Sequence, residues 1–167
     1  MPAMDTFTFV HVLISLAGIV SGFVVVGGML SGNRLDTWTS AFIGTTVATS
    51  STGFGFPFDH LLPSHIVGII SLVVMAIAIV ARYGYRMAGG WRRTYAITAI
   101  ASLYFNVFVL VVQLFQKLPA LKAVAPTQSE PPFAVTQLLV LAAFVYLGIR
   151  AVRGFREPAT AVGQALR

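Results

Sequence analysis

Five long stretches of this sequence contain no charged residue, and this feature limits the fold more than any other. The stretches lie between Asp5 and Arg34, Asp36 and Asp59, Asp59 and Arg82, Arg93 and Lys117, and Glu130 and Arg150. A helix rises about 1.5 Å per residue, so each stretch is long enough to cross a hydrocarbon core about 30 Å thick. The sequence therefore predicts that lipid surrounds most of the chain.

Composition agrees with a membrane location. Of the 167 residues, 57% are hydrophobic and only 10% are charged, whereas charged residues make up about a quarter of a typical soluble domain. Only helices and closed barrels satisfy their own backbone groups in lipid, and the apolar stretches lack the strict two-residue alternation of barrel strands. We therefore expect an all-α, polytopic transmembrane helix bundle.

The predicted spans form a single transmembrane domain over residues 1–152, which a short basic tail follows over residues 153–167. The N-terminus has no Lys or Arg before the first apolar stretch, so we interpret this stretch as a retained span rather than a secretory signal. The five predicted spans are residues 7–30, 37–56, 64–81, 94–115 and 133–149.

The basic residues predict the orientation, because cytoplasmic loops of membrane proteins carry an excess of Lys and Arg. Residues 82–93 contain four arginines and the tail beyond Gly148 contains four more, two crossings away. Five spans place all nine arginines inside and only Lys117 and Lys122 outside. We expect a multi-pass protein of the cell inner (cytoplasmic) membrane with a cytoplasmic C-terminus and an outside N-terminus. The net charge of +6 then reflects membrane orientation, and we expect no nucleic-acid partner.

The second predicted span contains an unusual number of hydroxyl side chains. Either neighbouring helices bury it, or it is re-entrant, which would leave four spans and an inside N-terminus. Between Thr37 and Phe56 its nine hydroxyl residues are Thr37, Thr39, Ser40, Thr45, Thr46, Thr49, Ser50, Ser51 and Thr52.

The end of this span, Ser51-Thr52-Gly53-Phe54-Gly55, resembles the selectivity filter of potassium channels, in which backbone carbonyls line the pore. The resemblance covers about 20 residues and implies a re-entrant pore segment between two pore helices. Phe56-Pro57 stands where that family places an aspartate after the last glycine.

Two histidines predict a cofactor site. His11 lies near the start of the first span and His65 near the start of the third, so five spans put both imidazoles at matching depth near the outer interface. Two imidazoles on facing helices are what b-type haem requires, and His11 shares a helix face with Ser15, Gly18 and Gly22. In the alternative interpretation, His11 bonds a hydroxyl on another helix, His65 caps a helix near the head groups, and the small residues only pack. A re-entrant second segment would separate the two histidines.

A polar stripe predicts a second site, on the fourth span. It is either a hydrogen-bonded seam against the second span or a path for water, protons or a small polar solute. No carboxylate lies within any span, which argues against a carboxylate proton relay. The stripe contains Thr98, Ser102, Asn106, Gln113 and Gln116.

The longest connection, residues 117–132, is proline-rich and predicted to lie outside. It would cover the outer ends of the first and third spans as a lid, or lie at head-group level as a strap.

These patterns leave three functions open. The first is a small integral membrane protein with a ligand or cofactor site near the outer face, in its sharpest form b-type haem electron transfer through His11 and His65. The second is a channel or small-solute carrier along the polar stripe. The third is an accessory subunit of a larger membrane complex, or a homo-oligomer. The sequence contains no cysteine and no set of residues typical of hydrolytic or phosphoryl-transfer enzymes.

Overall fold

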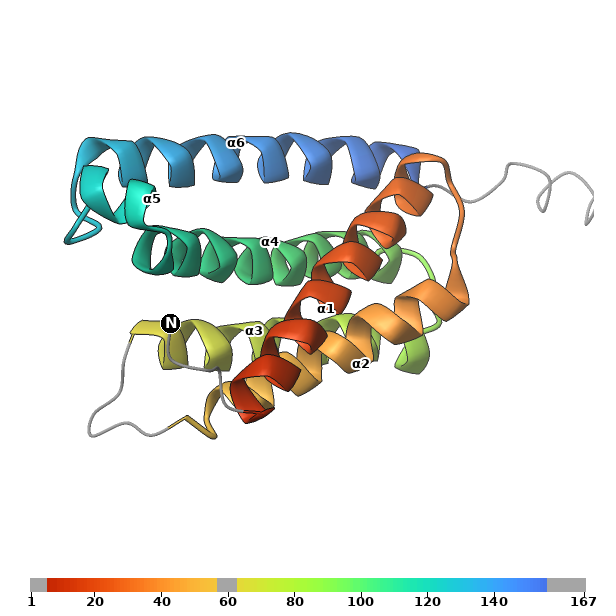
Figure 1. Ribbon diagram of the computed structural model, residues 1–167. Helices are drawn as coiled ribbons and strands as arrows, with labels where there is room; N and C mark the ends of the chain where they lie inside the picture. The colour runs from red at the N-terminus through yellow and green to blue at the C-terminus, as the bar shows by residue number, and fades with distance from the viewer. Residues whose placement is uncertain (1–5, 57–62, 156–167) are drawn as a thin grey trace, which may run out of the picture.

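The computed structural model describes residues 6–56 and 63–155, and in this part of the chain the regular elements are all helical (Figure 1). Four helical segments, Thr6–Leu30, His65–Gly84, Trp91–Lys117 and Pro131–Gly154, are long and apolar enough to cross a membrane. The prediction of a helical membrane bundle is therefore confirmed. The elements are α1 (Thr6–Leu30), α2 (Asp36–Gly53), α3 (Pro63–Ile79), the π-helical turn η1 (Val80–Gly84), α4 (Trp91–Lys117), α5 (Pro119–Val124) and α6 (Pro131–Gly154).

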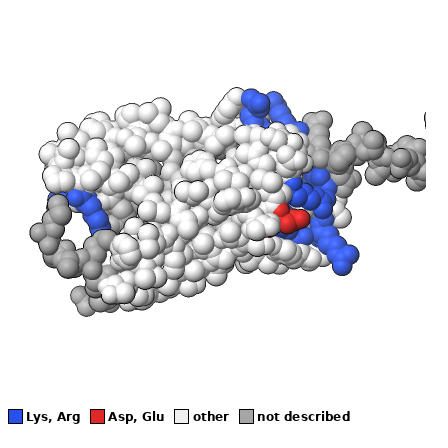
Figure 2. Space-filling view, turned by 45° about the vertical axis from the view of Figure 1, so that its right-hand side comes forward, with Lys and Arg blue, Asp and Glu red and all other residues white. Residues whose placement is uncertain are grey.

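Charge lies at the two ends of the bundle, and the face between them in Figure 2 is uncharged. We call one end the arginine end, where Arg34, Arg82 and Arg92 lie near the ends of α2, α3 and α4. We call the other the lysine end, which carries Lys117 and Lys122 on α4 and α5. An uncharged side wall between charged ends is the surface that a bilayer requires.

Helix α2 runs the length of the bundle from one end to the other. In its first turn Asp36 forms an ion pair with Arg82, whose side chain is only 4% exposed. Near its last residue, Thr52 Oγ1 lies 2.8 Å from His11 Nδ1 in the second turn of α1.

Three polar side chains of α2, Thr39, Thr46 and Ser50, are buried against its neighbours. Thr39 and Thr46 are 0% and 1% exposed. The hydroxyl of Tyr95 lies 3.4 Å from Thr39 Oγ1, and Asn106 Nδ2 donates to Thr46 Oγ1 at 3.0 Å. These bonds explain how a helix that is too polar to insert alone lies inside an apolar bundle.

Part of the segment that resembles a potassium-channel filter is helical. Residues Ser51 to Gly53 are the last turn of α2. Their carbonyls accept within the chain, since Ser51 O accepts from Phe54 N at 3.2 Å and Thr52 O from Gly55 N at 2.9 Å. Carbonyls used to end a helix do not line a pore.

The core fills the arginine half of the bundle. Its most deeply buried large side chains come from α1 to α4 and are at most 1% exposed: Met29, Phe42, Met75, Tyr95 and Leu103. Helix α1 crosses α4 obliquely (Figure 1), and Gly22 permits this crossing, because a Cβ there would lie 2.6 Å from Leu103 Cδ1. Toward the lysine end the two helices diverge.

The connection between α4 and α6 is a strap. Gln128 Nε2 donates to the carbonyl of Val112 at 3.0 Å, and Ala125 is buried in a small cluster with Val111 and Phe115. These contacts lie on the side of α4 away from the cavity described below. Desolvation raises the pKa of Glu130. Hydrogen bonds from the side chain and backbone of Thr127 and from the backbone of Ser129 together lower this pKa by more, so the net pKa is below its ordinary value.

Candidate ligand-binding cavity

A cavity of about 540 Å³ opens at the lysine end between α1, α2, α3 and α4. This volume lies in the range of about 300–1,000 Å³ that is usual for small-molecule sites. Its wall contains both predicted histidines and part of the predicted polar stripe. The wall includes His11, Ser15, Leu16, Thr49, Phe54, Phe56, His65, Phe105, Asn106, Val109, Gln113, Leu114, Lys117 and Leu118.

The cavity is deep, and its inner end is closed. Along α4 its wall extends from Leu118 to Phe105, which at 1.5 Å per residue is about 20 Å, or roughly two thirds of a hydrocarbon core. Immediately beyond lie Leu103 and Phe42, which are 0% and 1% exposed. The cavity is therefore blind toward the arginine end.

Hydrogen bonds fix the ring of His11. Thr52 Oγ1 donates its proton to the carbonyl of Ala48 at 2.7 Å. A hydroxyl has a single proton, so when Thr52 donates to Ala48 it accepts from His11 Nδ1–H across the 2.8 Å contact. In the neutral imidazole, Nε2 then carries the free lone pair. The ring of Phe56 packs edge-on against the imidazole, with centroids 5.1 Å apart.

His65 reaches the same cavity from the other side of α2. It is 5% exposed, and its ring centroid lies 5.5 Å from that of Phe54. The two histidines line one cavity. They do not lie on helices packed face to face, however, because α1 packs along α2 and α2 packs on α3. Phe54 and Phe56, which follow α2, contact one histidine each.

The predicted polar stripe of α4 is divided. Asn106 and Gln113 line the cavity, whereas Thr98, Ser102 and Gln116 do not. Thr98 Oγ1 donates to the carbonyl of Thr94 at 2.7 Å. Ser102 is 0% exposed, and its hydroxyl has no partner in the described residues. Gln116 Nε2 lies 3.5 Å from Gln128 Oε1 in the strap. The seam interpretation holds where Asn106 meets Thr46.

Two polar groups of the cavity wall have no protein partner among the described residues. Thr49 Oγ1 is buried and makes no hydrogen bond, and the Gln113 side chain makes none to any described residue. A buried hydroxyl without a partner costs about 1–3 kcal/mol, so Thr49 points to a bound molecule or water. The hydroxyl-rich composition of α2 was the sequence signal for Thr49, but composition does not tell which hydroxyls face a cavity.

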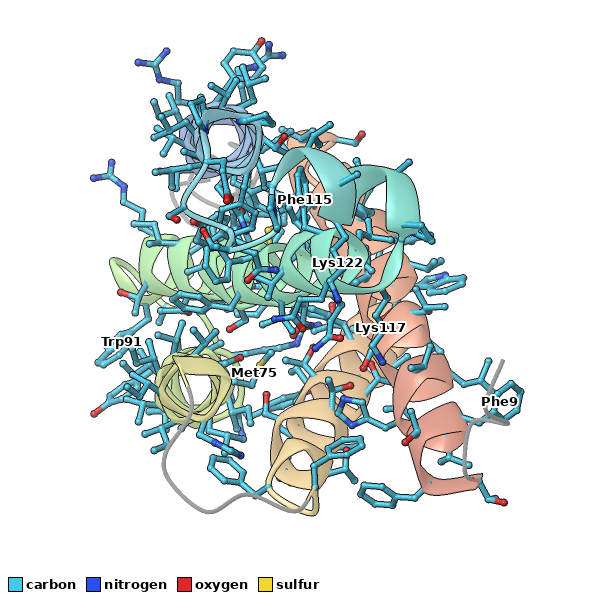
Figure 3. The ribbon with its side chains drawn as sticks, turned by 60° about the vertical axis from the view of Figure 1, so that its left-hand side comes forward. Phe9, Met75, Trp91, Phe115, Lys117 and Lys122 are labelled. Carbon is cyan, nitrogen blue, oxygen red and sulfur yellow. The ribbon has the colours of Figure 1, made fainter. Side chains whose placement is uncertain are left out.

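The mouth of the cavity carries one lysine side chain. Lys117 lines the cavity at its outer rim, and Lys122 lies at the same end on α5 (Figure 3). In the described part of the chain, no group of three or more His, Cys, Asp or Glu side chains is close enough together to hold a metal ion.

Comparison with protein-family models, with curated proteins and with solved structures finds no match to this chain. The functional argument therefore rests on the cavity itself.

Proposed function

We propose that this protein is a membrane-embedded binding protein whose cavity holds a small molecule near the outer face of the membrane. The observation that carries the proposal is the cavity of about 540 Å³ with the buried, unpartnered hydroxyl of Thr49 in its wall. A wall that is mostly apolar, with a few hydrogen-bonding groups that converge on it, is the usual form of a ligand site.

The proposal includes five spans, with the arginine end in the cytoplasm and the lysine end outside. The contacts of α2 at both ends of the bundle support the span count. The arginines support the orientation, since positive charge is retained on the cytoplasmic side. The membrane would be the inner membrane of a prokaryotic cell.

The absence of cysteine from the sequence allows a direct topology test. Phe7→Cys, at the start of α1, and Gly90→Cys, between η1 and α4, lie at opposite ends of the bundle. In intact cells, a membrane-impermeant maleimide should label Phe7→Cys and leave Gly90→Cys unlabelled until the cells are opened. Labelling of Gly90→Cys in intact cells would reverse the orientation, and labelling of neither residue would indicate an inside N-terminus.

Filling the cavity tests the binding function. Val109→Trp and Ser15→Phe each add bulk to the wall, from α4 and α1. Val135→Trp is the matched control, because Val135 is 52% exposed on α6. Mass spectrometry of solvent extracts should find a small molecule with wild type and Val135→Trp that is lost from both filled variants. Identical extracts from all four folded proteins would refute the proposal.

A b-type haem is the second candidate, and one observation favours it. The Nδ1–H of His11 is held by Thr52, and metal-bound histidines usually have the other ring nitrogen fixed in this way. The position of α2 between α1 and α3 is less suited to a pair of facing ligands. Titration of the purified protein with haemin tests this candidate: a shifted Soret band that disappears in both His11→Leu and His65→Leu would support it, and an unshifted band would eliminate it.

A channel along the polar stripe is less well supported, because the cavity is blind toward the arginine end. The exposed face of α6 does not favour the accessory-subunit alternative. Helix α6 fully buries only Phe144 and Ala151, and lipid covers the remaining apolar face as well as a partner helix would.

A further inference from the structure

The cavity opens sideways as well as toward the lysine end. Leu16 on α1 and Leu114 and Leu118 on α4 line the cavity, yet they are 42%, 37% and 46% exposed. Residues that face both the cavity and the surroundings form its rim. Because α1 and α4 diverge toward this end (Figure 1), this part of the rim lies between two membrane-facing helices. Its leucines are apolar, and Lys117 lies at its outer edge. A molecule dissolved in the bilayer can enter there without crossing water.

The inner wall offers neutral hydrogen-bonding groups. His11 presents the lone pair of Nε2, which accepts a hydrogen bond, whereas the Thr49 hydroxyl and the Gln113 amide can donate one. Lys117, the positively charged lysine of the wall, lies one turn farther along α4 toward the lysine end than Gln113. A charged phosphate in the inner part of the cavity would therefore lack a countercharge, which is costly in a low-dielectric site.

The side walls are suited to a flat ring. Phe105 lines the cavity from α4, and Phe54 and Phe56 line it from the segment after α2. Aromatic side chains pack favourably against other rings in stacked or edge-on arrangements. The site thus combines aromatic walls, neutral donors, one neutral acceptor and an apolar side exit.

We propose that the cavity binds an isoprenoid quinone, with the ring held by His11, Thr49 and Gln113 and the tail leaving between α1 and α4 into the outer leaflet. This inference rests on the proposed binding function and names its ligand class. In the quinol form a ring hydroxyl donates to His11 Nε2. A ring carbonyl accepts from Thr49 Oγ1 or from the Gln113 amide.

Binding of decylubiquinone to the full-length protein in nanodiscs tests the assignment. Thr49→Val keeps the shape of the side chain and removes the hydroxyl. One lost hydrogen bond of about 0.5–1.5 kcal/mol corresponds to a Kd that rises roughly twofold to twelvefold. We expect the same direction for Gln113→Leu. Thr136→Val is the matched control, because its hydroxyl bonds the carbonyl of Pro132 within α6 at 2.8 Å.

The side exit has its own test. Leu114→Trp should obstruct the apolar rim and weaken binding of decylubiquinone, while the tail-less duroquinone retains its affinity. Val135→Trp again serves as the control for added bulk on the lipid side. Equal loss of both quinones in Leu114→Trp would refute the tail path.

The outcomes separate this inference from the proposed function. If decylubiquinone does not bind, or binds Thr49→Val and Gln113→Leu as tightly as wild type, the quinone assignment is wrong. The binding function survives that result if the extracts still contain another molecule, such as a phospholipid, that Val109→Trp and Ser15→Phe lose. If those extracts are identical as well, both proposals are wrong.

Discussion

Adding a single methyl group at Gly22 probes the crossing from which the cavity opens. A Cβ at this position would lie 2.6 Å from Leu103 Cδ1 and 2.8 Å from Phe42 Cε2. Carbon atoms in good contact are about 3.5–4.0 Å apart, so one of the helices has to move by about 1 Å. Leu103 and Phe42 are 0% and 1% exposed, which leaves them no free space. Overpacking of this kind costs about 1–3 kcal/mol.

Replacing Gly22 with alanine also stabilises the helix itself, because alanine is a better helix former than glycine by about 1 kcal/mol. Gly27→Ala isolates that term: Gly27 lies on the same helix, and a Cβ there would have nothing within 4 Å. We therefore expect Gly22→Ala to be less stable than Gly27→Ala by about 1–3 kcal/mol, a factor of roughly 5 to 150 in the folded-to-unfolded ratio.

Reversible unfolding of the purified protein in mixed micelles, with increasing fractions of sodium dodecyl sulfate, measures this difference. Circular dichroism and a tertiary-structure probe should give the same midpoint for each variant. The reasoning fails if Gly22→Ala unfolds at the same detergent fraction as Gly27→Ala, since α1 would then not be held closely against Leu103 and Phe42.

Three further predictions concern polar contacts. Asp36→Asn should lower the free energy of unfolding by about 1–3 kcal/mol in the same titration, because Arg82 is 4% exposed and loses its ion-pair partner. Asp36 is 81% exposed, so the cost stays below that of a fully buried pair, and Asp36→Glu should recover much of the lost stability. Asn106→Leu should cost about 1–3 kcal/mol, because the Thr46 hydroxyl, in a side chain that is 1% exposed, loses its donor; wild-type stability would refute the buried bond. The pKa of Glu130 is lowered, so its carboxylate stabilises the strap fully above the ordinary pKa of a glutamate and loses that effect as the pH falls through the lowered pKa. Amide exchange in the strap, corrected for the intrinsic pH dependence, should therefore accelerate on acidification in the wild type but not in Glu130→Gln.

The apolar helices were predictable because their signal is local. Charge-free stretches placed spans at residues 7–30 and 133–149, and the structure has helices at Thr6–Leu30 and Pro131–Gly154. Each of these helices satisfies its own backbone, so hydropathy and length are sufficient to find it. The helix ends differ by a few residues, because polar residues extend a helix beyond its apolar part.

The candidate site was predictable only in part. His11 and His65 were expected at matching depth, and they share a cavity. Their helices were expected to face each other, but α2 packs between them. Thr49 was one of nine hydroxyl residues in its segment. Helical spacing shows which residues share a face, but it does not show which neighbour that face meets.

By itself, the sequence determined that the chain is a helical membrane bundle with arginines at the ends of its apolar segments, because transfer of each segment into lipid depends on that segment alone. The tertiary structure decided where the hydroxyl-rich α2 lies, because the cost of burying its side chains depends on partners such as Tyr95 and Asn106 from another helix. It also decided that a cavity exists at all. Close packing at Gly22 and the oblique crossing of α1 leave space at the lysine end, and no local pattern encodes a crossing angle.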